Sequence, residues 1–201
     1  MTDTDALLPA LDTEVDILHH RLVARAGAQD LLDITYRELD SPIGGLLIAA
    51  TERGLVRVAF ASEGEDAVLS ALAARVSPRI LRSSARLEQP ARELAEYFAG
   101  TRTVFESPVD HALSSGFRGD VQRYLARIPY GATASYGQVA TAVGNPRAVR
   151  AVGSACATNP LPIIQPCHRV LRGDGSLGGY LGGLSAKRAL LALESPQAAL
   201  G

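Results

Sequence analysis

The chain has 201 residues and a formal net charge of −1, with 47% hydrophobic and 20% charged residues. These proportions are typical of a globular protein, and the length allows one large core or two small domains. The two cysteines form neither a disulfide framework nor a zinc pattern, and no apolar run is long enough to span a membrane. We therefore expect a cytoplasmic protein that does not bind membranes.

The charge is distributed unevenly along the chain. Residues 1–112 carry 11 basic and 18 acidic side chains, whereas residues 113–201 carry 9 basic and 3 acidic ones. This asymmetry favours a polyanion as the partner of the C-terminal part and not of the N-terminal part. A solvated basic face is the alternative, and charge alone does not separate the two.

Residues 1–30 are predicted to form a helical extension. Apolar residues recur at spacings of three and four, which places them on one helical face: Leu8, Leu11, Val15, Leu18 and Leu22. This face could dock on the rest of the protein, pair with another chain or be partly disordered, and we expect docking. No targeting signal is recognisable here.

Residues 31–112 are predicted to form a small α+β domain, with an antiparallel meander followed by two helices. We found no catalytic constellation in it and expect a scaffold. The expected strands are Leu32–Arg37, Leu46–Ala50 and Leu55–Phe60, and the expected helices are Glu65–Val76 and Leu87–Phe98.

Residues 113–201 are predicted to be mostly helical. Helices are expected at Gly116–Arg127, at Ser135–Val143 with Ser135 as N-cap, from Asn145 (N-cap) to about Thr158, and at Ser185–Glu194. The middle two are joined by a short turn containing Gly144. With Arg147 and Arg150 near the start of the second, they are a candidate helix-turn-helix.

Pro166-Cys167-His168-Arg169-Val170 places a thiol beside an imidazole, followed by a glycine-rich loop over residues 173–184 that a flat ligand could approach closely. A neighbouring base or cation lowers the pKa of a cysteine and makes it a nucleophile. We therefore expect Cys167 to be held ionised at the floor of a cleft. The alternative is a buried, inert thiol, which is the interpretation we give Cys156.

Several motifs in this order resemble the O6-alkylguanine-DNA alkyltransferase family, over about residues 32–194. They are Ile128-Pro129-Tyr130-Gly131, Ser135-Tyr136-Gly137, Arg150-Ala151-Val152-Gly153, Asn159-Pro160, Pro166–Val170 and Gly179-Tyr180 through Gly182-Gly183-Leu184. The resemblance implies an α+β fold. An N-terminal ribonuclease-H-like α/β domain with a small antiparallel sheet would precede a mostly helical, winged-helix-like DNA-binding domain that carries the cysteine.

The resemblance also implies the reaction: single-turnover transfer of an alkyl group from O6 of guanine, and from O4 of thymine, in duplex DNA to the protein. The base must first be flipped out of the stack. Cys167 matches the alkyl acceptor, His168 the base that activates it through a water, and Glu194 the carboxylate that orients the histidine. Asn159 matches the brace of the active-site turn, and Tyr136 the phenol that donates toward guanine N3.

The remaining roles also come from the resemblance. Arg150 matches the finger that fills the gap left by the flipped base, although a plain phosphate contact is the alternative. Other DNA contacts are expected from Tyr136, Arg147, Ser135 and Gly153, in the minor groove. The base pocket is expected to include Val170, Tyr180, Leu181 and Gly182.

The chain departs from the family pattern in three ways. It has no tryptophan, it has Gln165 where an aliphatic residue is usual, and it has no cysteine in the N-terminal domain. Because the N-terminal domain lacks cysteine, we expect no zinc or other metal. We also expect no nucleotide or other cofactor, and a monomer that binds double-stranded DNA. Two other functions fit parts of the pattern: a damaged-DNA binder that does not accept the alkyl group, and a Cys-His-Glu hydrolase or thiol redox protein.

Overall fold

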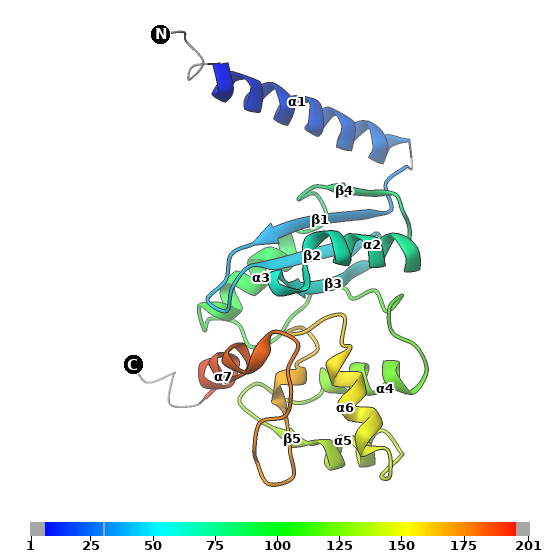
Figure 1. Cartoon of the computed structure of the whole chain (residues 1–201), viewed down its shortest axis with the longest axis vertical. Coiled ribbons are helices and arrows are strands. Elements are labelled where there is room, and N and C mark those ends of the chain that lie inside the picture. Colours follow the sequence, from blue (N-terminus) through cyan, green and yellow to red (C-terminus); the bar gives the residue numbers. More distant parts are fainter. Residues whose placement is uncertain (1–6, 30, 196–201) are drawn as a thin grey trace.

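The computed structural model describes residues 7–29 and 31–195. Figure 1 shows three parts along the long axis of the molecule: a separate N-terminal helix, a layer built on a β-sheet, and a helical layer beneath it. The family-derived expectation of an α+β fold with a helical C-terminal domain is confirmed.

The sheet has the strand order β3-β2-β1-β4. Strands β1 (Ile34–Leu39), β2 (Leu46–Thr51) and β3 (Gly54–Phe60) form the predicted antiparallel meander, with Leu39 opposite Leu46 and Leu46 opposite Phe60. Strand β4 (Ile80–Arg82) pairs with β1 in parallel, so the sheet is mixed and not purely antiparallel as expected. With three residues, β4 is too short to show an alternating pattern in the sequence.

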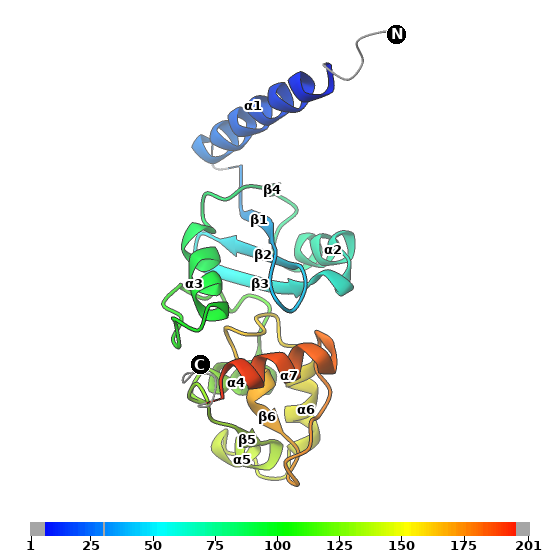
Figure 2. The same cartoon turned by 90° about the vertical axis from the view of Figure 1, so that its left-hand side faces the viewer.

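Helices α2 (Glu65–Arg75) and α3 (Glu88–Phe98) cover opposite faces of this sheet, and a 3-10 turn, η1 (Ala61–Glu63), follows β3 (Figure 2). Successive residues of a strand point to opposite faces. In β2, Leu47 and Ala49 pack with α2, whereas Leu46, Ile48 and Ala50 pack with α3. Both faces are therefore dry, which explains why every residue of β2 is buried.

The helical layer contains α4 (Gly116–Leu125), α5 (Tyr136–Ala142), α6 (Val149–Ala157) and α7 (Gly183–Leu193). The short strands β5 (Ala134–Ser135) and β6 (Val170–Leu171) pair in parallel, and the 3-10 turn η2 spans Cys167–Arg169.

Ser135 caps α5 as expected. Its hydroxyl accepts a hydrogen bond from the Gln138 backbone amide at 3.1 Å, and the Gln138 side-chain Oε1 accepts one from the Ser135 backbone amide. The predicted start of α6 at Asn145 is wrong, because Asn145 and Ala148 close a turn with a 3.0 Å backbone hydrogen bond and the helix begins at Val149.

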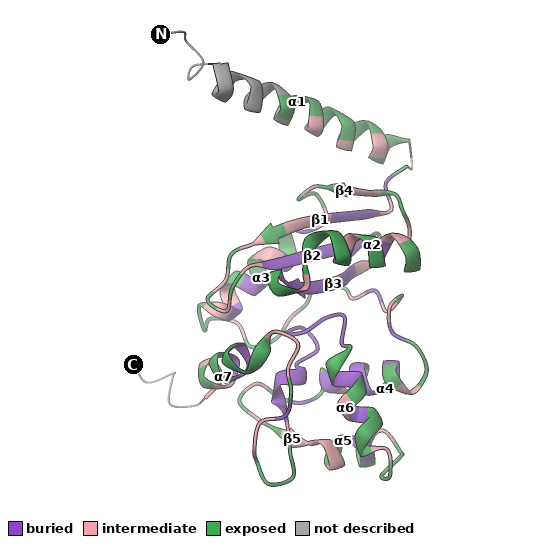
Figure 3. Cartoon of the chain, in the orientation of Figure 1, coloured by how far each residue is buried: buried purple, intermediate pink, exposed green. Residues whose placement is uncertain are grey.

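The two layers share an apolar core. Leu161, Ile163 and Leu190 from the helical layer pack in the same cluster as Leu94 and Tyr97 of α3. Figure 3 shows buried residues on both sides of this junction. The segment 161–164, which precedes Cys167, therefore packs directly against the sheet layer.

Helix α1 (Leu7–Ala28) exists, but the expectation that it docks is wrong. Val15, Leu18 and Leu22 of its apolar stripe are more than half exposed, and Leu8 and Leu11 lie outside the residues whose side chains are described. His19 Nε2 contacts the carbonyl oxygen of Arg82 at 2.5 Å, while the helix axis stands away from the sheet in Figure 1. Among the described residues, no helix has the length and apolarity that crossing a membrane demands.

Gly54 is a sensitive backbone position, and we predict that Gly54→Ala destabilises the protein by about 3 kcal/mol. Its φ is +130°, and an added Cβ would lie 2.2 Å from the Pro108 carbonyl oxygen, which accepts a hydrogen bond from Leu55. Gly44→Ala is the matched control, because Gly44 also has a positive φ but has open space around it. Urea unfolding should show a loss of about 1 kcal/mol for the control; equal losses would contradict the steric explanation.

Candidate active site

A buried turn carries the candidate nucleophile. All residues from Asn159 to Val170 are buried, and the Asn159 side chain ties the turn together. Its Nδ2 donates to the Gln165 carbonyl at 2.7 Å, and its Oδ1 accepts from the Leu161 amide at 3.0 Å. Ile163 has a φ of +75°, a costly conformation for a β-branched residue. The turn is thus held in a strained shape by the packing and hydrogen bonds around it.

Glu194, at the C-cap of α7, is the centre of a buried polar network. Its Oε1 accepts hydrogen bonds from Tyr97 Oη at 2.6 Å, His168 Nε2 at 2.8 Å and Arg169 Nη2 at 2.8 Å, and its Oε2 accepts from Arg169 Nε at 2.8 Å. Burial alone would raise the pKa of Glu194, but the hydrogen bonds from His168 and Arg169 lower it to about 2. The carboxylate is therefore ionised at neutral pH.

The ionised carboxylate fixes the tautomer of His168. Because Glu194 has no proton to donate, the His168 Nε2 must carry the hydrogen, which leaves Nδ1 as an acceptor. Burial lowers the pKa of His168, although Glu194 opposes this, so the imidazole is neutral. Its Nδ1 is buried and has no protein partner among the described residues. A neutral histidine with a free acceptor nitrogen is prepared to take a proton.

Cys167 has 3% of its surface exposed, and burial raises the pKa of its thiol to about 11. A hydrogen bond with Asn159 and the positive charge of Lys187 act in the opposite direction and are too weak to reverse the effect of burial. The expectation of a resting thiolate is therefore wrong: the thiol is protonated until something changes its surroundings. Cys156 is buried as expected, and burial raises its pKa to about 12.

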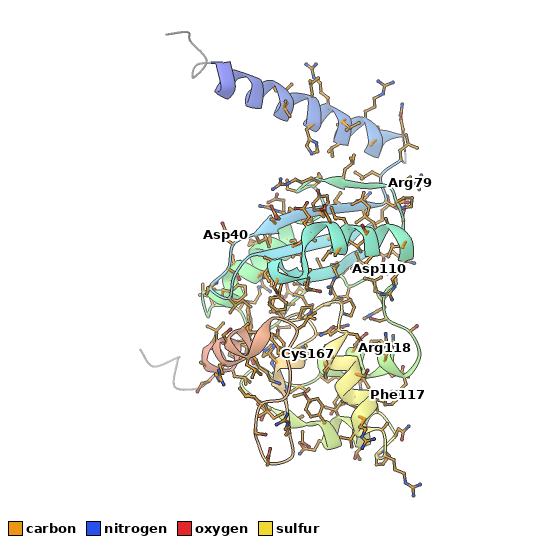
Figure 4. All side chains as sticks on the ribbon, in the orientation of Figure 1. Asp40, Arg79, Asp110, Phe117, Arg118 and Cys167 are labelled. Atoms are coloured by element: carbon orange, nitrogen blue, oxygen red, sulfur yellow. The ribbon has the colours of Figure 1, made fainter. Side chains whose placement is uncertain are left out.

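A hollow of about 550 Å³ lies beside this turn, between α6 and the glycine-rich loop. It is lined by Tyr136, Gly153, Ala157, Arg172, Gly178, Gly179, Tyr180 and Leu181. Tyr136 and Tyr180 of this lining also pack against the apolar cluster that contains Cys167, although Cys167 itself is not part of the lining. Figure 4 shows Cys167 between α6 and α7, under the sheet layer.

Some expected pocket residues have other contacts. Gly182 is not part of the lining. An added Cβ there would lie 2.5 Å from the Phe60 ring, so a residue without a side chain is needed for Phe60 of the sheet layer to pack this closely. Val170 is fully buried, with its amide bonded to the Cys167 carbonyl and its carbonyl accepting from Lys187 Nζ at 2.7 Å. Arg147 and Arg150 are exposed at the start of α6, away from the buried network.

Three buried residues near Cys167 and Glu194 carried no role in the sequence analysis. Lys187 shares a helical face with Leu190 and Glu194 through spacings of three and seven, which is a recognisable signal. Arg169 lies within the pentapeptide, but nothing in the sequence distinguishes it from an ordinary surface arginine. Tyr97 comes from the other layer, and nothing local to α3 indicates its contact with Glu194. Among the described residues, no cluster of three or more metal-ligating side chains occurs.

A mixed sheet is stacked on a helical layer that buries a cysteine, a histidine and a glutamate near an open hollow, an arrangement that favours chemistry at a thiol. Residues 34–111 match the family model described as the ribonuclease-like domain of 6-O-methylguanine DNA methyltransferase. Residues 116–196 match the model of its DNA binding domain. The chain belongs to the 6-O-methylguanine-DNA methyltransferase family, which confirms the resemblance found in the sequence.

Individual relatives agree with this assignment. The chain is 40% identical over 161 residues to a methylated-DNA–protein-cysteine methyltransferase of Mycolicibacterium paratuberculosis, covering 80% of this chain and 92% of the relative. It is 39% identical over 173 residues to the bifunctional transcriptional activator/DNA repair enzyme Ada of Escherichia coli, covering 85% of this chain but only 48% of Ada. A crystal structure of Mycobacterium tuberculosis OGT in complex with DNA superposes with a TM-score of 0.69 at 38% identity, over 80% of this chain and 92% of that one.

Gly178 sets the position of Tyr136, and we predict that Gly178→Ala slows reaction at Cys167 at least tenfold. An added Cβ at Gly178 would lie 2.3 Å from the Tyr136 hydroxyl, so the ring must move out of the hollow. Gly179→Ala is the control, because Gly179 lines the same hollow with no atom within 4 Å of the added carbon. Rates of alkyl transfer from methylated DNA test this; equal rates for the two variants would show that the Tyr136 position does not matter.

The raised pKa of Cys167 gives a prediction for the free protein. With a folded pKa of about 11, the reactive thiolate should increase about tenfold per pH unit from pH 7 to 9.5, without a plateau. Labelling by iodoacetamide, followed by mass spectrometry of the Cys167 peptide, measures the rate. A plateau near pH 7 would mean that the resting sulfur is ionised after all.

Proposed function

We propose that this protein repairs DNA by transferring a methyl or larger alkyl group from O6 of guanine in duplex DNA to the sulfur of Cys167. The bond between O6 and the alkyl carbon breaks as the S–C bond forms, and guanine leaves with the electron pair. The product is a stable thioether, so each molecule acts once. The observation that carries the proposal is the buried Cys167–His168–Glu194 arrangement beside a hollow large enough for a base.

Activation of the thiol requires a route for its proton. We infer that a water joins Cys167 Sγ to the free Nδ1 of His168, and that Glu194 stabilises the imidazolium formed. At pH 7, a pKa of about 11 corresponds to about 5 kcal/mol for ionising the thiol. Irreversible alkyl transfer would draw this unfavourable ionisation forward, because the reaction consumes the thiolate as it forms.

The flipped base would occupy the hollow beside Cys167. Position 6 of guanine lies within the base pair, so the nucleotide must leave the stack before the sulfur can reach it. Tyr136 would donate a hydrogen bond to guanine N3 and neutralise the leaving base, while Tyr180 and Leu181 line its faces. Backbone groups of Val170 and Leu181, with Gly182 nearby, would recognise the base edge; O4-alkylthymine would be a second substrate.

DNA would be held from the minor-groove side by the helix pair α5 and α6. Arg150 would enter the stack as the flipped base leaves, and Arg147, Ser135 and Gly153 would contact the backbone. Residues 113–201 thus act as the DNA-binding and alkyl-acceptor domain, residues 31–112 as the supporting α/β domain, and residues 1–30 as an extension. We propose a cytoplasmic monomer that needs no metal or cofactor.

The direct test is a mass measurement. Incubation with a duplex containing O6-methylguanine should add one methylene unit to the Cys167 peptide, at one methyl group per protein molecule. Cys167→Ser should bind the same duplex and gain nothing. Binding without any mass change in the wild type would make the protein a damaged-DNA binder, and repeated turnover on an activated ester would make it a hydrolase.

A further inference from the structure

A second hollow, of about 310 Å³, lies between the two layers and adjoins the base hollow. Its lining comes from β3, α2, α4 and the segment that follows α6. Ala157 and Leu181 belong to the walls of both hollows, so the two hollows adjoin at these residues. Whatever enters the base hollow therefore has its covalent neighbours close to this second site.

The second hollow is positively charged. Arg57, Arg75 and Arg118 line it together with a single acid, Glu63. Arg57 is paired with Glu63 and also donates to the Pro160 carbonyl at 3.3 Å, so these two charges cancel. Two positive charges remain at the wall of the hollow.

Neither remaining arginine is neutralised within the described part of the chain. Arg75 Nη2 donates to the Leu113 carbonyl at 3.1 Å, and neither Arg75 nor Arg118 forms an ion pair with a carboxylate of a described residue. Arg75 also acts on Arg57: burial lowers the pKa of Arg57, and the positive charge of Arg75 lowers it further. Arg75 and Arg118 are both exposed and line the same hollow, so the two layers each contribute one positive charge that an anion could neutralise.

We propose that this hollow binds a backbone phosphate of the lesion-containing DNA strand, next to the flipped nucleotide. Guanidinium groups suit phosphate oxygens because they form paired, charge-assisted hydrogen bonds. A strand carries one phosphate per nucleotide, so a base held in the neighbouring hollow brings phosphates to the shared Ala157–Leu181 wall. Figure 4 shows Arg118 on α4 below the sheet, while Arg75 reaches the site from α2.

This proposal rests on the proposed repair function and extends it, because it gives the sheet layer a direct part in DNA binding. The charge distribution of the sequence indicated the opposite, since residues 1–112 carry an excess of acids. The fold nevertheless places Arg75, from the acidic residues 1–112, in the wall of the same hollow as Arg118, from the basic residues 113–201.

The test compares Arg75→Gln, Arg118→Gln and the double variant, each in a Cys167→Ser background so that binding is reversible. Affinity for an O6-methylguanine duplex is measured between 50 mM and 200 mM salt. Loss of one phosphate contact should lower the slope of log K against log salt by about 0.9 for the double variant. Arg118→Gln is informative alone, because Arg118 has no internal hydrogen bond to lose among the described residues.

Arg92→Gln is the matched control, since Arg92 is an exposed arginine on α3, across the sheet from α2. An unchanged slope in the double variant, or an equal change in the control, would overturn the proposal. A second measurement locates the phosphate: duplexes carrying one uncharged methylphosphonate at a time, on either side of the lesion. At the contacted position, the difference between the parent and the double variant should vanish; a difference that persists at every position contradicts the assignment.

Failure of the repair function is detected separately. With Cys167 intact, transfer from the free O6-methylguanine base involves no phosphate, so the parent and Arg75→Gln/Arg118→Gln proteins should react at equal rates. No transfer by either protein, from the free base or from the O6-methylguanine duplex, refutes the repair function. A loss of free-base transfer confined to the double variant refutes the phosphate site, because it shows damage to the chemistry itself.

Discussion

The structure depends on one buried carboxylate. Glu194 receives four hydrogen bonds, from Tyr97 in the sheet layer and from His168 and Arg169 in the active-site turn. A buried charge is tolerated only when it is paired and fully hydrogen-bonded. The same contacts therefore join the two layers, fix the histidine tautomer and hold the turn that carries Cys167. Fold stability and reactivity share a single set of interactions.

The balance of buried charge explains how a protonated thiol fits a nucleophilic role. Arg169 and Glu194 neutralise one another, whereas the fully buried Lys187 has a carbonyl oxygen as its hydrogen-bond partner among the described residues. Burial lowers the pKa of Lys187 and raises that of Cys167, so each group resists charging by itself. A thiolate would give Lys187 a counter-ion. Ionisation is thus unfavourable in the resting protein, but a thiolate, once formed, would find the positive charge of Lys187 already in place.

Local signals in the sequence predicted most of the fold. The features that they did not predict are contacts between segments far apart in the chain. The meander, the helices and the Ser135 cap follow from periodicity and capping chemistry, which act over a few residues. The parallel strand β4 and the contact of Tyr97 with Glu194 join segments far apart in the chain. The apolar stripe on α1 predicts a helix, but it does not predict whether another segment packs against that stripe. The site residues came from the family motifs, whereas the protonation state of Cys167 depends on burial that no motif encodes.

The position of Glu194 has a consequence for how the protein becomes functional during synthesis. Its partners are residues 97, 168 and 169, so the ribosome must finish almost the whole described chain before the carboxylate can meet them. Until α7 has folded, Arg169 lacks its counter-ion and the imidazole lacks a fixed orientation. A nascent or C-terminally clipped polypeptide would lack the carboxylate that joins the layers and orients the imidazole, so its thiol would stay chemically idle and incomplete molecules would not waste themselves on stray alkyl donors.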